Sequence, residues 1–296
     1  MLIGKNGQVG WELNKGLLLA NELISVSREQ LDLKDEQETR AFIRSVNPQL
    51  IINATAFNGV ELAEKDSKEA DWINGTIPGI LAEEALNQKA AFIHFSTDYV
   101  FDGTKSSPYT EEDMPNPINA YGKSKLQGET NIKQVGGSYM IFRTSWAYGL
   151  RGKNFLLTIL DLVRNHQEVK VVTDQRGAPT WCSDISNAIL DILDLGKSDM
   201  NSFFKQHSGL YHLTSQGSTT WFEFAHTFID LYMKHTGETI PQVIPISSKD
   251  YHAIAKRPQN SILSNQKIND TFNVHLNDWK YSLNQVISRI GENQHG

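Results

Sequence analysis

Cysteine is almost absent from this chain, which has one, Cys182, among 296 residues. A single cysteine excludes an internal disulfide, and chains without disulfides are typical of a reducing compartment. The sequence therefore predicts a cytoplasmic protein. Cys182 stands in no paired cysteine motif, so we interpret it as a structural residue.

Long uncharged runs and basic clusters are also missing. The longest uncharged runs, residues 45–60 and 206–222, are shorter than the ~20 residues of a membrane span and contain many Asn, Gln, Ser and Thr residues. A glycine loop begins at Gly4, in the place of the pattern that a signal peptide would have, so we expect no signal peptide. The net charge is −6 and no Lys/Arg-rich run is present. We therefore expect neither a membrane nor a nucleic acid as partner.

Metal-ligand spacing is missing as well. The nine histidines include no His-Glu-x-x-His and no Cys/His ligand pattern, so we predict no metal site built by the protein. The hydrophobic share of 39% is sufficient for one large core or a core plus a lobe, and we expect two lobes.

A glycine loop opens the chain. Gly4, Gly7 and Gly10 permit a tight turn, close approach of backbone N–H groups to a pyrophosphate, and close packing of a helix that starts near Gln8. A helical pattern and then a β-like run at 23–27 follow, which is the context that a dinucleotide-binding loop needs. Because only Met1, Leu2 and Ile3 precede the loop and a strand usually has about 5 residues, we expect a clipped first strand and a sequence that starts a few residues late.

The position after the second predicted strand selects the cofactor. NAD-binding loops place Asp or Glu there for the ribose hydroxyls, whereas a basic residue accepts a 2′-phosphate. This chain has Ser27-Arg28 there, and Lys5 in the glycine loop adds a second cation. We therefore predict NADPH, and NADH stays open because Glu29 is adjacent.

Tyr121 and Lys125 lie one helical turn apart in Tyr121-Gly-Lys-Ser-Lys125. Residues i and i+4 share a helix face, so the ammonium can favour the phenolate of a tyrosine whose pKa is otherwise about 10. Alone, the pattern favours a surface tyrosine beside a solvated lysine. Together with the glycine loop it predicts a proton-transfer pair.

Strand and helix patterns alternate through the first half of the chain. We predict strands at 50–53, 92–95 and 139–143 and helices at 72–88 and 121–133, and later a helix whose N-terminus is the capping box Thr220-Trp-Phe-Glu223. Such alternation predicts an α/β fold with a Rossmann-type doubly wound parallel sheet. We expect an NADPH-binding domain over residues 1–180, with the Tyr/Lys helix included. A smaller substrate-binding lobe is expected mainly over residues 181–296, with the chain crossing back to the sheet.

Seven segments together form a family pattern. They are residues 4–10, Asn53-Ala-Thr-Ala56, Ser96-Thr-Asp-Tyr-Val-Phe-Asp-Gly103, Tyr121-Gly-Lys-Ser-Lys125, Arg143-Thr-Ser-Trp146, Asp174-Gln-Arg-Gly-Ala-Pro-Thr180 and Arg257-Pro-Gln-Asn-Ser261. In this order they resemble the dTDP-4-dehydrorhamnose reductases, which belong to the extended short-chain dehydrogenase/reductases. The resemblance spans nearly the whole chain, and its third and sixth segments are its most specific parts.

The resemblance implies NADPH-dependent reduction of the C4 ketone of a nucleotide-linked 6-deoxy-4-ketohexose, in the usual case giving dTDP-L-rhamnose. It implies that Tyr121 donates the proton, that Lys125 holds the nicotinamide ribose and lowers the tyrosine pKa, and that Thr97 stabilises the developing alkoxide. The expected cofactor-binding residues are Gly4, Asn6, Gly7, Gln8, Val9, Gly10, Arg28, Asp32, Ala54, Ala56, Tyr121 and Lys125. The expected substrate-binding residues are Asn58, Val60, Asp98, Tyr99, Trp146, Asn154, Gln175 and Arg257, with Tyr99 and Trp146 beside the sugar and Arg257 at the diphosphate.

One loop departs from the family pattern. Where the family commonly has His-Thr-x-Val-Asp, this chain has Phe57-Asn-Gly-Val-Glu61, so the loop beside the nicotinamide and the sugar is altered. The exact 4-ketosugar and its nucleotide therefore stay open. Some relatives favour Mg²⁺ at a subunit interface, but no carboxylate cluster in this sequence can be assigned to it, and a homodimer is left open.

Three alternatives remain beside the main hypothesis. An epimerase or dehydratase would use the same Tyr/Lys pair but retain its nicotinamide through turnover. A reductase of a talose- or fucose-type precursor would leave the architecture unchanged. The fold also serves as a non-catalytic regulatory subunit of a methionine adenosyltransferase complex, and the intact Thr97, Tyr121 and Lys125 argue against that role.

Overall fold

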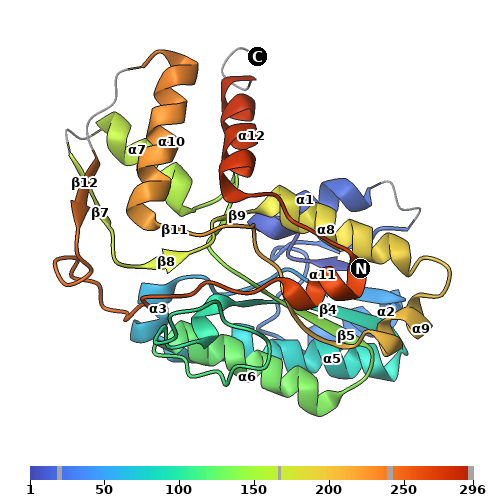
Figure 1. Ribbon diagram of the computed structural model, residues 1–296. Coiled ribbons are helices and arrows are strands. Elements are labelled where there is room, and N and C mark those ends of the chain that lie inside the picture. The colour runs from blue at the N-terminus through green and yellow to red at the C-terminus, as the bar shows by residue number, and fades with distance from the viewer. Residues whose placement is uncertain (19–21, 166–167, 239–242, 293–296) are drawn as a thin grey trace.

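A parallel sheet forms the centre of the molecule (Figure 1). The computed structural model describes residues 1–18, 22–165, 168–238 and 243–292. The strand order is β10-β5-β4-β3-β1-β2, and each neighbouring pair is parallel. The strands are β1 (Leu2–Ile3), β2 (Ser25–Val26), β3 (Leu50–Asn53), β4 (Ala91–Thr97), β5 (Tyr139–Thr144) and β10 (Gly209–His212). Together with the helices on both faces, this order confirms the expected doubly wound α/β fold.

Helices cover both faces of the sheet, in two layers above and below it in Figure 1. On one face, α1 (Gln8–Leu17), α8 (Cys182–Leu195), α9 (Met200–Gln206) and α11 (Gln266–Phe272) pack their buried apolar side chains into a common core with the sheet. On the other face lie α2 (Glu36–Val46), α5 (Ile77–Asn87) and α6 (Ala120–Val135). Burial of apolar residues from both faces explains why the central strands read as continuous hydrophobic runs.

A second hydrophobic core lies to one side of the sheet, at the upper left of Figure 1. Its elements come from both sides of residue 180. They are α7 (Phe155–Asn165), β7 (Val169–Val172), α10 (Trp221–Thr236), β12 (Val243–Ile246) and α12 (Trp279–Glu292). The strand β10 meanwhile returns to the central sheet beside β5. Each of the two cores contains segments from both sides of residue 180. The division of the chain at this residue therefore stays a prediction.

Several short elements complete the fold. The strand pairs are β6 (Ala147–Tyr148) with β9 (Thr180–Trp181) and β8 (Arg176–Gly177) with β11 (Thr219–Thr220). The short helices are α3 (Val60–Lys65), α4 (Ser67–Ala70), η1 (Asp71–Thr76) and η2 (Asp98–Val100). The predicted helix at 72–88 is thus a π-helical turn followed by α5. At α10 Thr220 Oγ1 accepts from the Glu223 N–H at 3.1 Å, as expected, whereas the Glu223 carboxylate accepts from Thr219.

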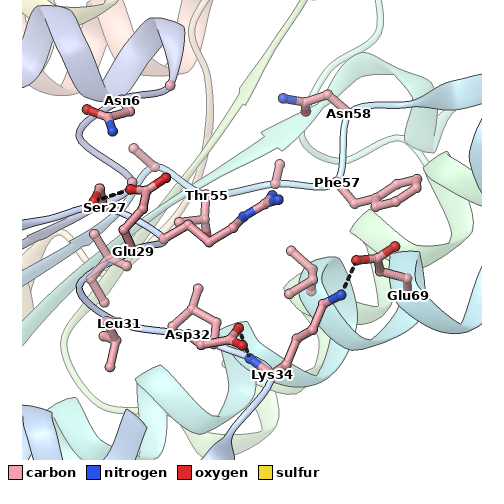
Figure 2. Close-up of a pocket in the computed structure, with 18 residues that line it drawn as sticks. Asn6, Ser27, Glu29, Leu31, Asp32, Lys34, Thr55, Phe57, Asn58 and Glu69 are labelled. Carbon is pink, nitrogen blue, oxygen red and sulfur yellow. Dashed lines mark hydrogen bonds and ion pairs between the residues drawn. The ribbon is translucent and has the colours of Figure 1, made fainter.

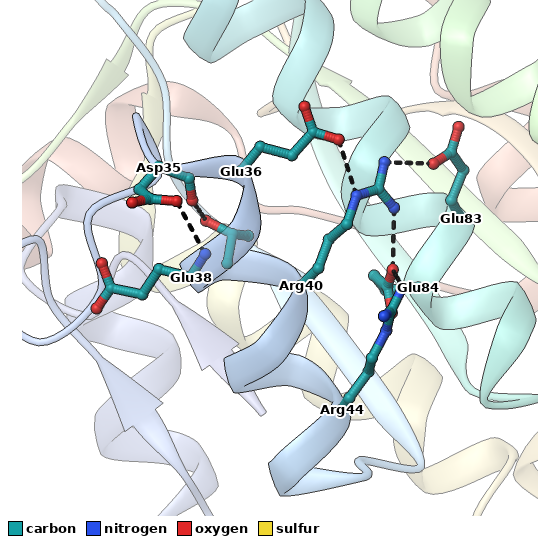
Figure 3. Close-up of polar contacts among 8 residues, drawn as sticks. Asp35, Glu36, Glu38, Arg40, Arg44, Glu83 and Glu84 are labelled. Carbon is teal, nitrogen blue, oxygen red and sulfur yellow. Dashed lines mark hydrogen bonds and ion pairs between the residues drawn. The ribbon is translucent and has the colours of Figure 1, made fainter.

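A network of ion pairs joins α2 to α5 (Figure 3). Glu84 of α5 has no exposed side-chain surface and accepts from Arg40 at 2.9 Å and from Arg44 at 2.7 and 2.8 Å. Arg40 also pairs with Glu36 and Glu83. A buried carboxylate is costly without partners, and the two arginines of α2 supply them to Glu84.

Candidate active site

A cavity of about 330 Å³ opens at the carboxyl ends of β1, β2 and β3 (Figure 2). The chain leaves β1 toward β2 on one side and places β3 on its other side, so the cavity lies where the strand order reverses. Open α/β sheets bind ligands at this point. Seven of the predicted cofactor-binding residues line the cavity, namely Gly4, Asn6, Gly7, Arg28, Asp32, Ala54 and Ala56. Asn58, which was expected at the substrate, lines it too.

The glycine loop is built so tightly that side chains are excluded from it. Gly4 has φ +91°, and its carbonyl accepts from the Gly7 N–H at 3.0 Å. A Cβ on Gly10 would lie 2.1 Å from the Gly4 oxygen. Gly7 is the N-cap residue of α1, so the first free N–H groups of that helix follow the loop directly. The loop therefore fits a pyrophosphate approached by backbone N–H groups.

The charges around this cavity differ in part from those expected. Arg28 lines it, but Lys5 Nζ donates to the Ser25 carbonyl at 3.2 Å. A second lining cation is Lys34, which pairs with Glu69 at 2.6 Å. Lys34 was missed because it lies six residues after Arg28 in an irregular loop, where no sequence period assigns it to the site.

Tyr121 and Lys125 project from the first turns of α6. The helix begins at Ala120 because Asn119 caps it, accepting from the Gly122 N–H at 2.7 Å. A Cβ on Gly122 would lie 2.1 Å from the Tyr99 carbonyl, so only glycine lets this turn approach the end of β4 so closely. The local sequence thus brings the Tyr/Lys pair to Thr97, whose hydroxyl acts to lower the pKa of the Tyr121 phenol.

The protonation states differ from the expectation that Lys125 lowers the pKa of Tyr121. Burial raises the pKa of the Tyr121 phenol to about 12, and the Thr97 hydrogen bond opposes that rise. Burial also lowers the pKa of Lys125 to about 8. Within the described part of the chain, the partners of Lys125 Nζ are the Phe95 carbonyl at 2.6 Å and His94 Nε2 at 3.4 Å. The ammonium is held against β4, so desolvation rather than the Tyr/Lys spacing determines both pKa values.

Asp98 is a buried carboxyl next to this pair. It accepts from the Thr97 hydroxyl at 3.1 Å and from the Ser145 hydroxyl at 2.9 Å. Burial raises its pKa to about 6 in spite of these donors. Tyr99 follows in the same short helix and meets the Tyr121 ring edge-on, with 6.0 Å between ring centroids. The structure therefore brings Thr97, Asp98, Tyr99 and Tyr121 together at the end of β4.

Trp146 is held in a strained conformation at the end of β5. Its φ is +46°, in the left-handed region that side chains rarely adopt. The indole stacks on Trp221 of α10 with ring centroids 3.5 Å apart, and a Cβ on Gly177 would lie 2.4 Å from it. Trp221 was not predicted, because its contact joins residues 75 positions apart and leaves no local sequence signal.

Arg257 contacts the loop that departs from the family pattern. Its guanidinium pairs with Glu61 at 2.8 Å, and Glu61 also accepts from the N–H groups of Ile254 and Ala255 at 2.9 and 3.1 Å. The Arg257 guanidinium also acts to lower the pKa of Tyr99, which places it near the Tyr121 cluster. Val60, expected at the substrate, is the first residue of α3 and lies beside Glu61.

The structure places Asn154 beside the start of α1 and buries Gln175. The Asn154 amide donates to Gln8 Oε1 at 2.8 Å, and its oxygen accepts from the Leu157 N–H at 3.0 Å. It therefore joins the start of α1 to the start of α7. Gln175 is buried, with 7% of its surface exposed. Val9, predicted for the cofactor, packs against the sheet core.

The described residues contain neither a membrane-spanning helix nor a metal cluster. Among them no helix is long and apolar enough to cross a membrane. No group of three or more His, Cys, Asp or Glu side chains within the same ranges is arranged to hold a metal ion. Cys182 is buried at the start of α8 and forms no disulfide.

Comparisons with known proteins agree with this geometry. The family described as RmlD substrate binding domain matches residues 1–291. A dTDP-4-dehydrorhamnose reductase from Burkholderia thailandensis is 38% identical over 97% of each chain. The crystal structure of a dTDP-4-dehydrorhamnose reductase from Clostridium acetobutylicum superposes with a TM-score of 0.89, at 34% identity over 98% of each chain. A Bacillus anthracis dTDP-4-dehydrorhamnose reductase, solved in complex with NADP, gives a TM-score of 0.86 at 30% identity over 97% of this chain and 98% of that one. The chain therefore belongs to the dTDP-4-dehydrorhamnose reductase family.

Proposed function

We propose that this protein reduces the C4 ketone of dTDP-4-dehydro-L-rhamnose with NADPH, giving dTDP-L-rhamnose. Membership of the reductase family supports the reaction class. The observation that carries the proposal is the cluster of Thr97, Tyr121 and Lys125 at the carboxyl end of β4, in the same sheet edge as the dinucleotide cavity. A proton donor and a hydride site must meet there for carbonyl reduction.

NADPH is the proposed cofactor because a relative was solved with NADP and because the cavity fits a dinucleotide. The glycine loop would hold the pyrophosphate, and Arg28 would pair with the 2′-phosphate. Lys34 can add a second positive charge if it exchanges its partner Glu69 for the phosphate. When bound, NADPH supplies the hydride that reduces the ketone.

Tyr121 is the proposed proton donor. Its raised pKa keeps the phenol protonated at neutral pH, which is the form that a reduction consumes. Thr97 would stabilise the carbonyl oxygen of the substrate as negative charge develops on it, because its hydroxyl lies at the end of β4 with Tyr121. Lys125 would hold the nicotinamide ribose and replace the proton that Tyr121 gives up.

The sugar nucleotide would lie between the two cores. Trp146 and Tyr99 offer aromatic faces to the C–H surface of a deoxyhexose, and Arg257 offers a guanidinium to the diphosphate. Trp146 is fixed by Trp221 behind it, so the sugar would meet a rigid wall. Asn58 and Val60 belong to the altered loop and would adjust the fit of the sugar.

NADPH oxidation with dTDP-4-dehydro-L-rhamnose generated in situ tests this proposal. We expect stoichiometric consumption of NADPH and a product with the configuration of dTDP-L-rhamnose by NMR. Turnover without net NADPH consumption would instead identify an epimerase or a dehydratase. A product of talose or fucose configuration would keep the reaction and change the substrate.

Two further properties are proposed, a cytoplasmic location and a homodimer. A cytoplasmic location follows from the single cysteine and from the dinucleotide and nucleotide-sugar chemistry of the family. A homodimer is compatible with the family, and sedimentation of the purified protein with and without Mg²⁺ measures both the oligomeric state and its metal dependence.

A further inference from the structure

A buried line of polar contacts leads from the cofactor cavity to Lys125. Thr55, which lines the cavity, donates to Asn53 Oδ1 from its N–H at 3.1 Å and from its hydroxyl at 2.6 Å. Asn53 Nδ2 contacts His94 Nδ1 at 3.2 Å, and His94 Nε2 contacts Lys125 Nζ at 3.4 Å. Asn53, His94 and Lys125 are each at most 1% exposed. No water can therefore replace a missing partner without rearrangement.

The contacts of Asn53 fix which ring nitrogen of His94 has the proton. Because Asn53 Oδ1 accepts two hydrogen bonds from Thr55, its amide NH₂ group must face His94 Nδ1. An NH₂ group can only donate, so Nδ1 must be the accepting nitrogen. The proton of the neutral ring then lies on Nε2, which is the nitrogen that faces Lys125.

We propose that His94 is a positioning residue for Lys125: Asn53 holds its ring as the Nε2–H tautomer, and this N–H faces the lysine nitrogen so that the ammonium loses its proton more readily. A neutral amine can accept from His94 and still donate to the Phe95 carbonyl at 2.6 Å. An ammonium has only donors, so it would face the Nε2–H without forming a hydrogen bond to it.

Other groups around Lys125 act in both directions. On α6, Tyr121 and Glu129 lie one turn before and after it, and Glu129 favours the charged amine. Arg143 of β5 pairs with Glu129 at 2.7 Å and opposes that effect. On β4, the Phe95 carbonyl accepts from the amine in either state. Burial is the largest influence and lowers the pKa of Lys125 to about 8, in the same direction as His94.

The consequence concerns the proposed role of Lys125 and so depends on the proposed function. A lysine that releases its proton near neutral pH is a stronger acid than a lysine of ordinary pKa, so the driving force for returning a proton to Tyr121 after each reduction is larger. His94 would thus set how readily Lys125 exchanges its proton, without contacting substrate or cofactor. Thr55 would connect this line of contacts to the cofactor cavity.

NMR of the full chain labelled with ¹⁵N-histidine tests the tautomer directly. Two-bond couplings to the ring carbon protons distinguish protonated from unprotonated ring nitrogens, and His94→Gln assigns the signals. We expect His94 to have a protonated Nε2 and an unprotonated Nδ1, unchanged between about pH 5 and pH 9, because burial lowers its pKa well below the usual value. A protonated Nδ1, or a ring that titrates in this range, overturns the proposal.

A second measurement follows the Nζ signal of Lys125 in ¹⁵N-lysine-labelled protein, assigned with Lys125→Met. In His94→Gln the side-chain amide can turn its oxygen toward the ammonium, so the midpoint of the titration should rise by about one pH unit, the size of one hydrogen bond. The pH at which kcat falls should rise with it. An unchanged midpoint in a folded variant overturns the proposal.

His212→Gln is the matched control. His212 is a fully buried histidine on β10 that contacts Arg143 at 3.5 Å rather than Lys125. Its replacement should cost stability in a similar way but leave the Lys125 midpoint unchanged. Both NMR measurements are independent of turnover, so a protein that fails to reduce the sugar nucleotide would refute the proposed function and leave this inference to its own test.

Discussion

Replacing Asp98 by asparagine should stabilise the protein relative to wild type, and this advantage should be larger at neutral pH than at pH 4. The carboxyl is 2% exposed and receives hydrogen bonds from the hydroxyls of Thr97 and Ser145. Burial disfavours its ionised form and raises its pKa from 3.8 to about 6. An asparagine keeps the oxygen that Thr97 contacts, and the Ser145 hydroxyl can rotate to accept from the new NH₂ group.

The sign and size follow from linkage. The folded state binds the proton more tightly than the unfolded chain, so stability falls as pH rises from about 4 to about 6 and stays lower above that. A shift of about 2 pKa units at 1.36 kcal/mol each corresponds to a cost on the order of 3 kcal/mol for the ionised carboxylate. Asp98→Asn removes this cost above pH 6 and changes little at pH 4.

Urea unfolding of both proteins between about pH 4 and pH 8 measures the difference. We expect the variant's advantage to increase by on the order of 3 kcal/mol across this range, with most of the change between pH 4 and pH 6. Asp102→Asn is the control: hydrogen bonds lower the pKa of Asp102, so its contribution changes only below the usual carboxyl range. A difference for Asp98→Asn that stays flat with pH would refute the reasoning.

Four other changes test separate parts of the site and fold. Tyr121→Phe should lower kcat by roughly 10²–10⁴ with the NADPH affinity retained, and near-normal turnover would exclude the phenol as proton donor. Arg28→Ala should weaken NADPH binding by about 10- to 100-fold, the loss of one charge-assisted contact, and leave NADH binding unchanged; calorimetry that finds equal losses would contradict the 2′-phosphate contact. Glu61→Gln should raise the KM for the sugar nucleotide by about tenfold with a smaller effect on kcat, because Arg257 loses its charged partner; an unchanged KM would separate this ion pair from substrate binding. Glu84→Gln should cost about 1–2 kcal/mol of unfolding free energy with kcat unchanged, since two arginines of α2 lose a charged acceptor; a urea midpoint equal to wild type would show that the network adds no stability.

The central elements could be predicted because their signals are local. The strand predicted at 50–53 agrees with β3, and those at 92–95 and 139–143 lie inside β4 and β5. Each is a short apolar run buried on both faces, which gives a strong pattern in the sequence. The β-like run at 23–27 holds a strand of only two residues, Ser25–Val26. Tertiary packing shortens it to the part that pairs with β1.

The contacts between the site residues could not be predicted, because they join residues that are far apart in the sequence. Glu61 and Arg257 lie 196 positions apart, and Trp146 and Trp221 lie 75 apart. The family pattern identified Tyr121 and Lys125, but it did not indicate that Lys125 would contact Phe95 and His94 of β4. A spacing of one helical turn shows only that two side chains share a face; the strand packed against that face selects the partner of each.

The protonation states of the cluster follow from burial acting on groups of opposite charge type. Desolvation raises the pKa of Tyr121 to about 12 and lowers that of Lys125 to about 8. At neutral pH both groups are therefore protonated. The ammonium of Lys125, which has the lower pKa, releases its proton more readily than the phenol of Tyr121. A reduction consumes one proton from the phenol, and the phenolate left behind recovers it from a neighbour that releases protons more easily. Burial alone thus orders the two groups for proton delivery in the reductive direction, and His94 strengthens that order by facing its N–H to the lysine.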